Sequence, residues 1–212
     1  MKSVRKYFLV ALFTMLVGLY GQSTVSAASV EPIDSPKYGA TYGELSARWW
    51  QWLLSIPAAT NPNLGGDCTQ GQYDDVWFLA GAFGGTGITR SCTIPTGKPI
   101  FFPVVNSVSF KPTSAETLLL LRSLAAGFID SVISHGCTVD GEPVMSYRVR
   151  SPSFSFIAPP GALVKASGTN PMVSDGYWVL LDPLPLGTHT VHFNTATSGG
   201  FTLDMTYTLT VQ

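Results

Sequence analysis

The sequence predicts a mainly β protein, an antiparallel β-sandwich with two α-helices packed on it. Three observations point to this fold class. The residues from Phe201 to Val211 alternate between apolar and polar side chains, as a half-buried antiparallel strand does. From Cys137 onward the chain has the pattern of short strands separated by turns, and two earlier segments have helical periodicity behind a capping box. A chain of 212 residues with 12% charged residues is expected to form one domain with a large core.

The N-terminus has the order of parts of a secretory signal peptide. Three basic residues precede an apolar run over 8–20, and small residues follow up to Ala27. The run is shorter than the roughly 20 residues that a membrane-spanning helix needs, and no second apolar stretch of spanning length follows. We therefore expect residues 1–27 to be a signal peptide. Residues 28–212 would then be a single mature domain, secreted or periplasmic, with no membrane span.

The charge balance excludes two classes of partner. The chain has 12 Lys and Arg residues and 13 Asp and Glu residues, for a formal net charge of −1. Loss of the leader would remove three basic residues and no acidic one, so the mature chain is faintly acidic. Nucleic acids and anionic membrane surfaces are bound through basic patches, and the sequence has no basic run. We expect neither as a partner.

The first helix is expected near 42–56. Thr41 and Glu44 form its capping box. One stripe of the helix is apolar and the opposite stripe is polar, so the apolar stripe should pack on the sheet. Trp50 lies outside both stripes, about 100° around the helix from Trp49, and we expect it at the rim, where a ligand or partner can reach it. The apolar stripe consists of Leu45, Trp49, Trp52, Leu53 and Ile56.

The second helix is expected near 115–134. Thr113 and Glu116 form its capping box, and Gly136 would end it. Arg122 falls within its apolar stripe, where it either covers apolar surface with its stem or pairs with a buried carboxylate. The stripe consists of Leu118, Leu121, Ala125, Phe128, Ile129, Val132 and Ile133.

Turn residues divide the rest of the chain into strands. The glycine-rich segment 81–87 predicts a hairpin turn, because a phosphate-binding loop needs a following helix and a lysine. Pro103 predicts an edge strand or a bulge, and Asp140 with Gly141 predicts a hairpin turn. The expected strands are 76–80, 89–94, 100–105, 147–150, 154–157, 177–181, 188–194 and 201–211.

Three cysteines fit one disulfide and one free thiol in an oxidising compartment. Cys68 and Cys92 bracket the predicted hairpin and are the natural pair. Closing a loop of this length stabilises a protein by roughly 3 kcal/mol in the chain-entropy model. Cys137 is then free, either as a buried thiol or as a thiolate nucleophile close to His135.

The segment from Pro183 to Phe193 resembles the corner and following strand near the end of bacterial immunoglobulin-like sandwich domains. With residues 49–52 (WWQW) and 76–81 (VWFLAG) included, the mature chain is similar to small secreted bacterial proteins of uncharacterised function. The resemblance implies a compact exported domain that is immunoglobulin-like in its C-terminal part. It carries over no activity and no site residue.

Aromatic side chains are the main candidates for a binding surface. The chain has five Trp, and three of them lie within 49–52. Aromatic faces stack on sugar rings, although Trp also fills cores. We take Trp50 as a candidate binding residue, together with Asp74 and Asp75 at the end of a polar loop. These residues favour an exported, non-catalytic binding module for a glycan, an envelope component or a protein partner.

The alternative function is a small secreted hydrolase with paired carboxylates as acid and base. Its carboxylates would come from Asp67, Asp74, Asp75 or Asp140. A hydrolase should bring such carboxylates together beside a deep pocket. A binding module should show a shallow aromatic surface instead.

We expect no metal and no cofactor. His189 and His192 are three residues apart on an expected strand, so they point to opposite faces. His189 is expected to be a core histidine with its hydrogen bonds satisfied. The oxygen-rich loop 61–75 matches no ordered spacing of calcium ligands.

Overall fold

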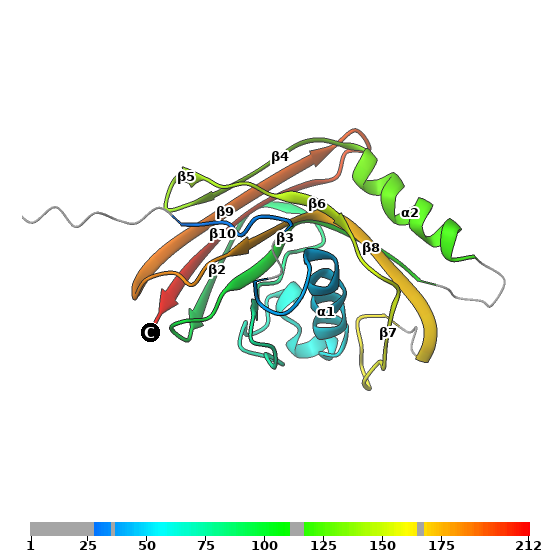
Figure 1. Ribbon diagram of the computed structural model, residues 1–212, viewed down its shortest axis with the longest axis horizontal. Coiled ribbons are helices and arrows are strands. Elements are labelled where there is room, and N and C mark those ends of the chain that lie inside the picture. The colour runs from blue at the N-terminus through cyan, green and yellow to red at the C-terminus, as the bar shows by residue number, and fades with distance from the viewer. Residues whose placement is uncertain (1–27, 35–36, 111–116, 165–167) are drawn as a thin grey trace, which may run out of the picture.

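The computed structural model describes residues 28–34, 37–110, 117–164 and 168–212. The predicted leader and the predicted capping box of Thr113 and Glu116 lie outside these ranges. Two mixed five-stranded sheets pack together, and two α-helices flank them (Figure 1). The prediction of a β-sandwich with two packed helices is confirmed. Every helix in the described ranges falls short of the length and apolar content needed to cross a bilayer.

The first sheet has the strand order β1-β3-β8-β6, and β7 also pairs with β8. β3 and β8 are antiparallel over most of their length, with a register shift between Pro103 and Val105. The predicted bulge at Pro103 is therefore present. The strands are β1 (Trp77–Phe78), β3 (Ile100–Phe110), β6 (Tyr147–Arg150), β7 (Phe154–Phe156) and β8 (Gly168–Leu181).

The second sheet has the strand order β2-β10-β9-β4-β5. β10 has the alternating burial that its sequence predicts. β4 begins directly after the second helix, so the prediction that helix continues to 134 is wrong. Val132 and Ile133 are β-branched and lie in a strand that pairs with β9. The strands are β2 (Gly85–Ile94), β4 (Val132–Val139), β5 (Glu142–Pro143), β9 (Gly187–Thr197) and β10 (Thr202–Val211).

Two strand pairs are parallel, although the sequence predicted antiparallel pairing. β1 is parallel to β3, and β2 is parallel to β10. The glycine-rich segment between β1 and β2 therefore crosses from one sheet to the other, and the predicted hairpin is wrong. Gly84 and Gly85 permit the crossing, because their φ angles of 95° and 119° suit glycine. The Cys68–Cys92 disulfide is confirmed, as a link between a loop and β2.

The first helix, α1 (Tyr42–Leu54), covers the face of the first sheet that points away from the second sheet (Figure 1). Successive residues of β3 and β8 face opposite ways. Phe101 and Trp178 pack with α1, whereas Phe102 and Val179 pack between the sheets. The first sheet is thus buried on both faces, which explains the continuous apolar run at the start of β3. Short 3-10 helices follow at Ala58–Thr60 and Pro62–Leu64.

The second helix, α2 (Leu118–Asp130), lies on the same side of the first sheet as the second sheet (Figure 1). Its buried contact is small, with Leu121 and Ala125 packed on Val173 of β8. Arg122 is half-buried and donates a hydrogen bond to the carbonyl oxygen of Ser151 at 3.2 Å, so its partner is a backbone carbonyl and not the buried carboxylate of its second predicted role.

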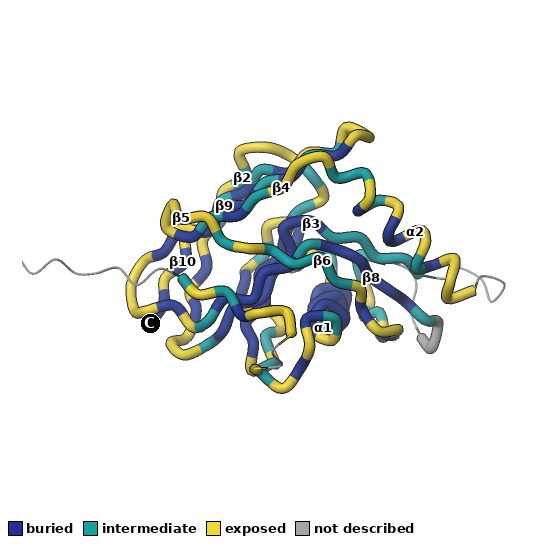
Figure 2. The backbone as a smooth tube through the Cα atoms, turned by 45° about the horizontal axis from the view of Figure 1, so that its top comes forward, coloured by how far each residue is buried: buried dark blue, intermediate teal, exposed yellow. Residues whose placement is uncertain are grey.

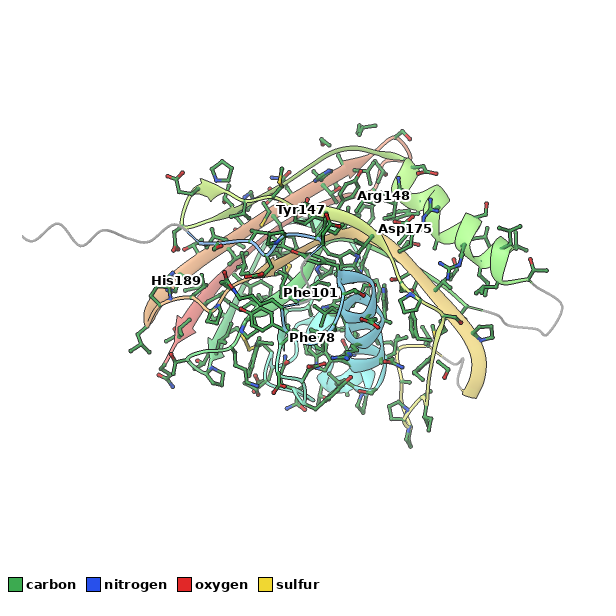
Figure 3. All side chains as sticks on the ribbon, viewed as in Figure 1. Phe78, Phe101, Tyr147, Arg148, Asp175 and His189 are labelled. Atoms are coloured by element: carbon green, nitrogen blue, oxygen red, sulfur yellow. A yellow bond between two sulfur atoms is a disulfide. The ribbon has the colours of Figure 1, made fainter. Side chains whose placement is uncertain are left out.

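Charged side chains also hold α2 in place. Asp175 of β8 is fully buried and accepts hydrogen bonds from Arg148 Nε at 3.1 Å and Nη2 at 3.0 Å (Figure 3). Arg148 Nη2 also pairs with Asp130, the last residue of α2, at 2.7 Å. A buried carboxylate is stable only when it is paired and hydrogen-bonded. Arg148 therefore both neutralises Asp175 and ties the end of α2 to the sheet.

Candidate functional site

A half-open cleft of about 240 Å³ lies at the edge of the first sheet. One wall belongs to α1, the opposite wall to α2 and β10, and β3 forms the floor. The crossing segment between β1 and β2 closes one end. The lining residues are Trp49, Trp50, Asn63, Gly81, Ala82, Phe83, Pro103, Val104, Val105, Asn106, Ser107, Val108, Phe128, Phe201 and Leu203.

The cleft follows the edge of β3. It is lined by every residue from Pro103 to Val108. Neighbouring residues in a strand point to opposite faces of the sheet, so a space that touches six in a row must lie beside the backbone. β1 pairs with β3 only at Ile100 and Phe101. Among the described residues, the rest of this edge of β3 has no hydrogen-bonded strand.

Side chains explain why β1 leaves the edge of β3. The Leu79 amide donates to the carbonyl oxygen of Phe101 at 3.2 Å, in continuation of the β1 pairing. The next carbonyl groups accept hydrogen bonds from side chains. The carbonyl oxygen of Leu79 accepts from Trp49 Nε1 at 2.8 Å, and that of Ala80 accepts from the Tyr207 hydroxyl at 2.9 Å. The chain is thereby turned toward the second sheet, and the edge beyond Phe101 stays open.

Arg90 of β2 fixes the end wall of the cleft. Its Nη1 donates to the carbonyl oxygens of Gly81 at 2.8 Å and Pro62 at 2.6 Å, and its Nη2 donates to Asn63 at 3.0 Å. Hydrogen bonds from a charged donor are stronger than neutral ones. One guanidinium therefore holds the loop after α1 and the crossing segment together.

Two donors that belong to the lining have no partner. The Nε1 of Trp50 and the Nδ2 of Asn106 are buried and donate to no acceptor among the described residues. A buried donor without a partner destabilises a protein by about 1–3 kcal/mol. The Nε1 atoms of Trp77 and Trp178 are also buried without a partner, but these two residues do not line the cleft. The cleft thus has apolar walls, and the two unpartnered donors are buried beneath its surface.

Trp50 is inside the protein and not at a rim. Its exposed fraction is 7%, and it packs edge-on against Trp49 at 5.1 Å between ring centroids. The expectation of a solvent-exposed Trp50 is corrected, because α1 is covered on more than one stripe. Trp50 nevertheless lines the cleft, and the exposed aromatic ring there belongs to Phe83, which is 65% exposed.

Asp74 and Asp75 lie on another surface, in a shallow groove with Arg48, Gln51 and Tyr73. The Asp74 carboxylate accepts from Arg48 Nη1 at 3.4 Å and from the Asp75 amide at 2.7 Å. The Asp75 side chain is 98% exposed and is 4.0 Å from Lys98. The structure does not bring these carboxylates to Trp50 or set them as a facing acid–base pair.

Cys137 does not have the surroundings of a nucleophile. It is the free cysteine, and burial raises the pKa of its thiol to about 12. A reactive cysteine needs a lowered pKa and access to solvent. Of the two roles that the sequence left open, the buried thiol matches the structure.

His189 is a buried histidine with both ring nitrogens satisfied, as predicted. Its Nδ1 is 2.7 Å from Asp140 Oδ2 and its Nε2 is 2.9 Å from the carbonyl oxygen of Pro185. Burial lowers the pKa of His189, but the hydrogen bonds to Asp140 and Pro185 outweigh it, so the pKa is raised overall. Within the described ranges, no three His, Cys, Asp or Glu side chains are grouped to hold a metal ion.

Sequence reasoning missed most of the cleft. Phe83 was read as part of a glycine-rich turn, and Asn106 follows an apolar run without any motif around it. Phe128 and Phe201 come from other parts of the chain and meet at 5.4 Å between ring centroids. The one local signal was the change from apolar to polar residues at Asn106, where β3 changes from buried to half-buried residues.

The chain matches no family model, and its sequence matches no curated protein. Three solved structures resemble part of the backbone. PbICP-C in complex with falcipain-2 has 9% sequence identity and a TM-score of 0.29, and the match covers 64% of this chain and 97% of that chain. Amebosin has 12% identity and a TM-score of 0.24, with 60% of this chain and 100% of that chain covered. The cysteine protease inhibitor EhICP2 from Entamoeba histolytica has 14% identity and a TM-score of 0.25, with 59% of this chain and 93% of that chain covered. At TM-scores this low, the likeness carries no argument about this chain.

Proposed function

We propose that this protein is an exported, non-catalytic binding module that holds a protein partner in the cleft at the edge of β3. The observation that carries the proposal is the lining itself. It consists of apolar and uncharged polar residues, with no titratable side chain among them. Acid–base catalysis needs such groups within reach of the reacting atoms, whereas an apolar cleft with a few polar groups suits binding.

The size and form of the cleft favour a protein partner. A space of about 240 Å³ is smaller than the pockets that enclose drug-sized ligands and suits a single large side chain. Phe83 adds an exposed aromatic ring at the mouth, and aromatic residues are enriched at protein interfaces. The buried Trp50 offers no open face on which a sugar ring could stack.

Site-specific photo-crosslinking in the producing cell tests the proposal. A photo-reactive phenylalanine at Phe83 should give one crosslinked partner. The same label at Leu186, which is exposed on another part of the surface, should not give it. Ala82→Leu, which narrows the cleft, should abolish the Phe83 product, and the purified partner should then bind the narrowed variant less tightly. A Phe83 product that survives Ala82→Leu contradicts the proposal.

One observation favours a glycan as a second candidate partner, at a different place. Tyr73 is 63% exposed and shares its groove with Arg48, Gln51, Asp74 and Asp75. An open aromatic ring beside polar groups is suited to a sugar. If an envelope glycan binds here, Tyr73→Ala should reduce sedimentation of the protein with purified peptidoglycan, whereas Phe83→Ala should leave it unchanged.

A further inference from the structure

We propose that the cleft takes an extended peptide segment of the partner as an added strand along the free edge of β3, with an apolar side chain of that segment seated beside Trp50. The inference rests on the proposed function and names its mode of binding. It combines two features of the cleft, namely an open strand edge and two apolar walls.

The open edge supplies the main-chain contacts. An unpaired strand edge presents amide and carbonyl groups on which another chain can pair. β1 already pairs with the start of this edge, at Ile100 and Phe101. A peptide laid along Pro103 to Val108 would continue the line of β1 at the point where the Trp49 and Tyr207 side chains draw the chain away.

The two walls supply the side-chain contacts. Successive side chains of an added strand point alternately to the two faces of the sheet. On one face they would meet Trp49 and Trp50 of α1, and on the other face Leu203 of β10 and Phe201 just before that strand. Both walls are apolar, so a charged side chain would be buried without a partner here, and an apolar one is favoured.

The open edge also determines the kind of occupant. A purely apolar occupant could fill the space between the walls, but it would not pair with the amide and carbonyl groups of the edge. A peptide carries a carbonyl group on every residue and an amide on every residue except proline. A peptide is therefore the occupant that matches the edge and the walls together.

Selection of defined peptides followed by an N-methyl scan tests the inference on the unaltered protein. Random octapeptides displayed on phage are selected on the wild type alone, and the peptides obtained are then measured against the wild type and against Ala82→Leu. Ala196→Leu, on the outer face of β9, is the matched control and should bind like the wild type. In the peptides obtained, N-methylation should weaken binding roughly fivefold to tenfold at alternate residues only, because alternate amides of an added strand face β3.

A pair of tryptophan variants tests the seat of the apolar side chain beside Trp50. Trp50 and Trp77 are both 7% exposed, but only Trp50 lines the cleft. Trp50→Phe should weaken peptide binding roughly fivefold because it removes part of that wall, whereas Trp77→Phe should leave it unchanged. In ¹⁵N spectra of the wild type, peptide should shift the indole signals of Trp49 and Trp50. The indole signal of Trp52, which lies outside the lining and donates to Gln70, should stay in place.

Four outcomes overturn the inference. Equal tolerance of N-methylation at every residue rules out strand addition but leaves the cleft as the partner site. Peptides that bind Ala82→Leu as tightly as the wild type remove the cleft and the proposed function together. Failure to obtain any peptide after selection does the same. A wild-type dimer in sedimentation equilibrium that Ala82→Leu dissociates assigns the edge to a second copy of the chain.

Discussion

The two α-helices have 13 residues each, but they contribute to the fold in different ways. In α1 nine residues are buried, among them three tryptophans, and in α2 four are buried. Figure 2 shows the contrast, with α1 almost wholly dark and α2 exposed along much of its length. Leu118, Leu119, Leu120 and Leu124 of α2 are 39%, 77%, 44% and 54% exposed.

The difference follows from how apolar residues are arranged along each helix. A run of leucines at 118–121 spreads over the whole circumference at about 100° per residue, so one face cannot bury them all. The large residues of α1 are also spread widely, but α1 has partners on more than one side. It packs on the first sheet, Trp52 donates to the carbonyl oxygen of Gln70, and Gln51 donates to that of Ser155. Hydrophobicity alone therefore does not decide which helix becomes core. The number of surfaces packed around it does.

The largest effect should come from the aromatic core of α1. Trp52 is fully buried and donates to the carbonyl oxygen of Gln70 at 2.8 Å. Trp52→Ala should lower the free energy of unfolding by about 3–5 kcal/mol, because it removes a large core side chain. Leu124→Ala in α2 should change it by less than about 0.5 kcal/mol. Urea denaturation measures the free energy of unfolding of both variants. Similar losses in the two would contradict the difference between α1 and α2.

The charged contact of α2 should come next. Asp175→Asn should lower the free energy of unfolding by about 2–3 kcal/mol, since it leaves Arg148 without its buried partner. Hydrogen exchange should quicken in α2 and not in α1. Asp130→Asn removes only the exposed end of this contact. Because that side chain is 62% exposed and its ion pair contributes about 0–1 kcal/mol, this variant should quicken exchange in the last turn of α2 alone. Faster hydrogen exchange in both helices would contradict the prediction that the Asp175 contact stabilises α2 and not α1.

Smaller effects are expected at the helix caps. Thr41 and Thr117 are the N-caps of α1 and α2, and each accepts from an amide of its own first turn. Thr41→Ala should lower the free energy of unfolding by about 1 kcal/mol. Thr117→Ala should change the free energy of unfolding by less than about 0.5 kcal/mol, because the first turn of α2 is already exposed. It should instead quicken hydrogen exchange of the amides in that turn. The reverse order of effects would make α2 the more cooperative helix.

The smallest effect should be a pH dependence that only α1 carries. Hydrogen bonds from the Thr41 amide and hydroxyl lower the pKa of Glu44 below its ordinary value of 4.5. The folded state thus favours the carboxylate, so this stabilisation is present above that value and is lost as the pH falls through the lowered pKa. Glu44→Gln should lower the melting temperature slightly at pH 7, and the difference should vanish in acid. An equal difference in melting temperature between the wild type and Glu44→Gln at pH 7 and in acid would contradict this prediction.

Local sequence patterns predicted the parts of the fold that short-range contacts determine. The α1 capping box and the alternation of β10 depend on residues a few positions apart, and both are present. The parallel pairs were missed, because they join segments that are distant in the chain. Cys68 and Cys92 were paired correctly although the hairpin between them does not exist.

The candidate site was predicted only at Trp50. Its surroundings depend on where β1 leaves β3, and that depends on hydrogen bonds from Trp49, Tyr207 and Arg90, which come from three separate elements. No local pattern carries that information. Asp74 and Asp75 were noted as adjacent carboxylates, but Arg48 and Lys98 are their neighbours in space.

The position of β10 has a consequence for the order of events during synthesis. β10 lies between β2 and β9, and β2 pairs with it from Leu203 opposite Gly85 to Val211 opposite Ile94. β2 is made early, and among the described strands it has no other hydrogen-bonded neighbour. β2 therefore has no strand partner until β10 has left the ribosome. A nascent chain arrested before Thr202 should therefore remain open to proteases at β2, whatever else has already folded.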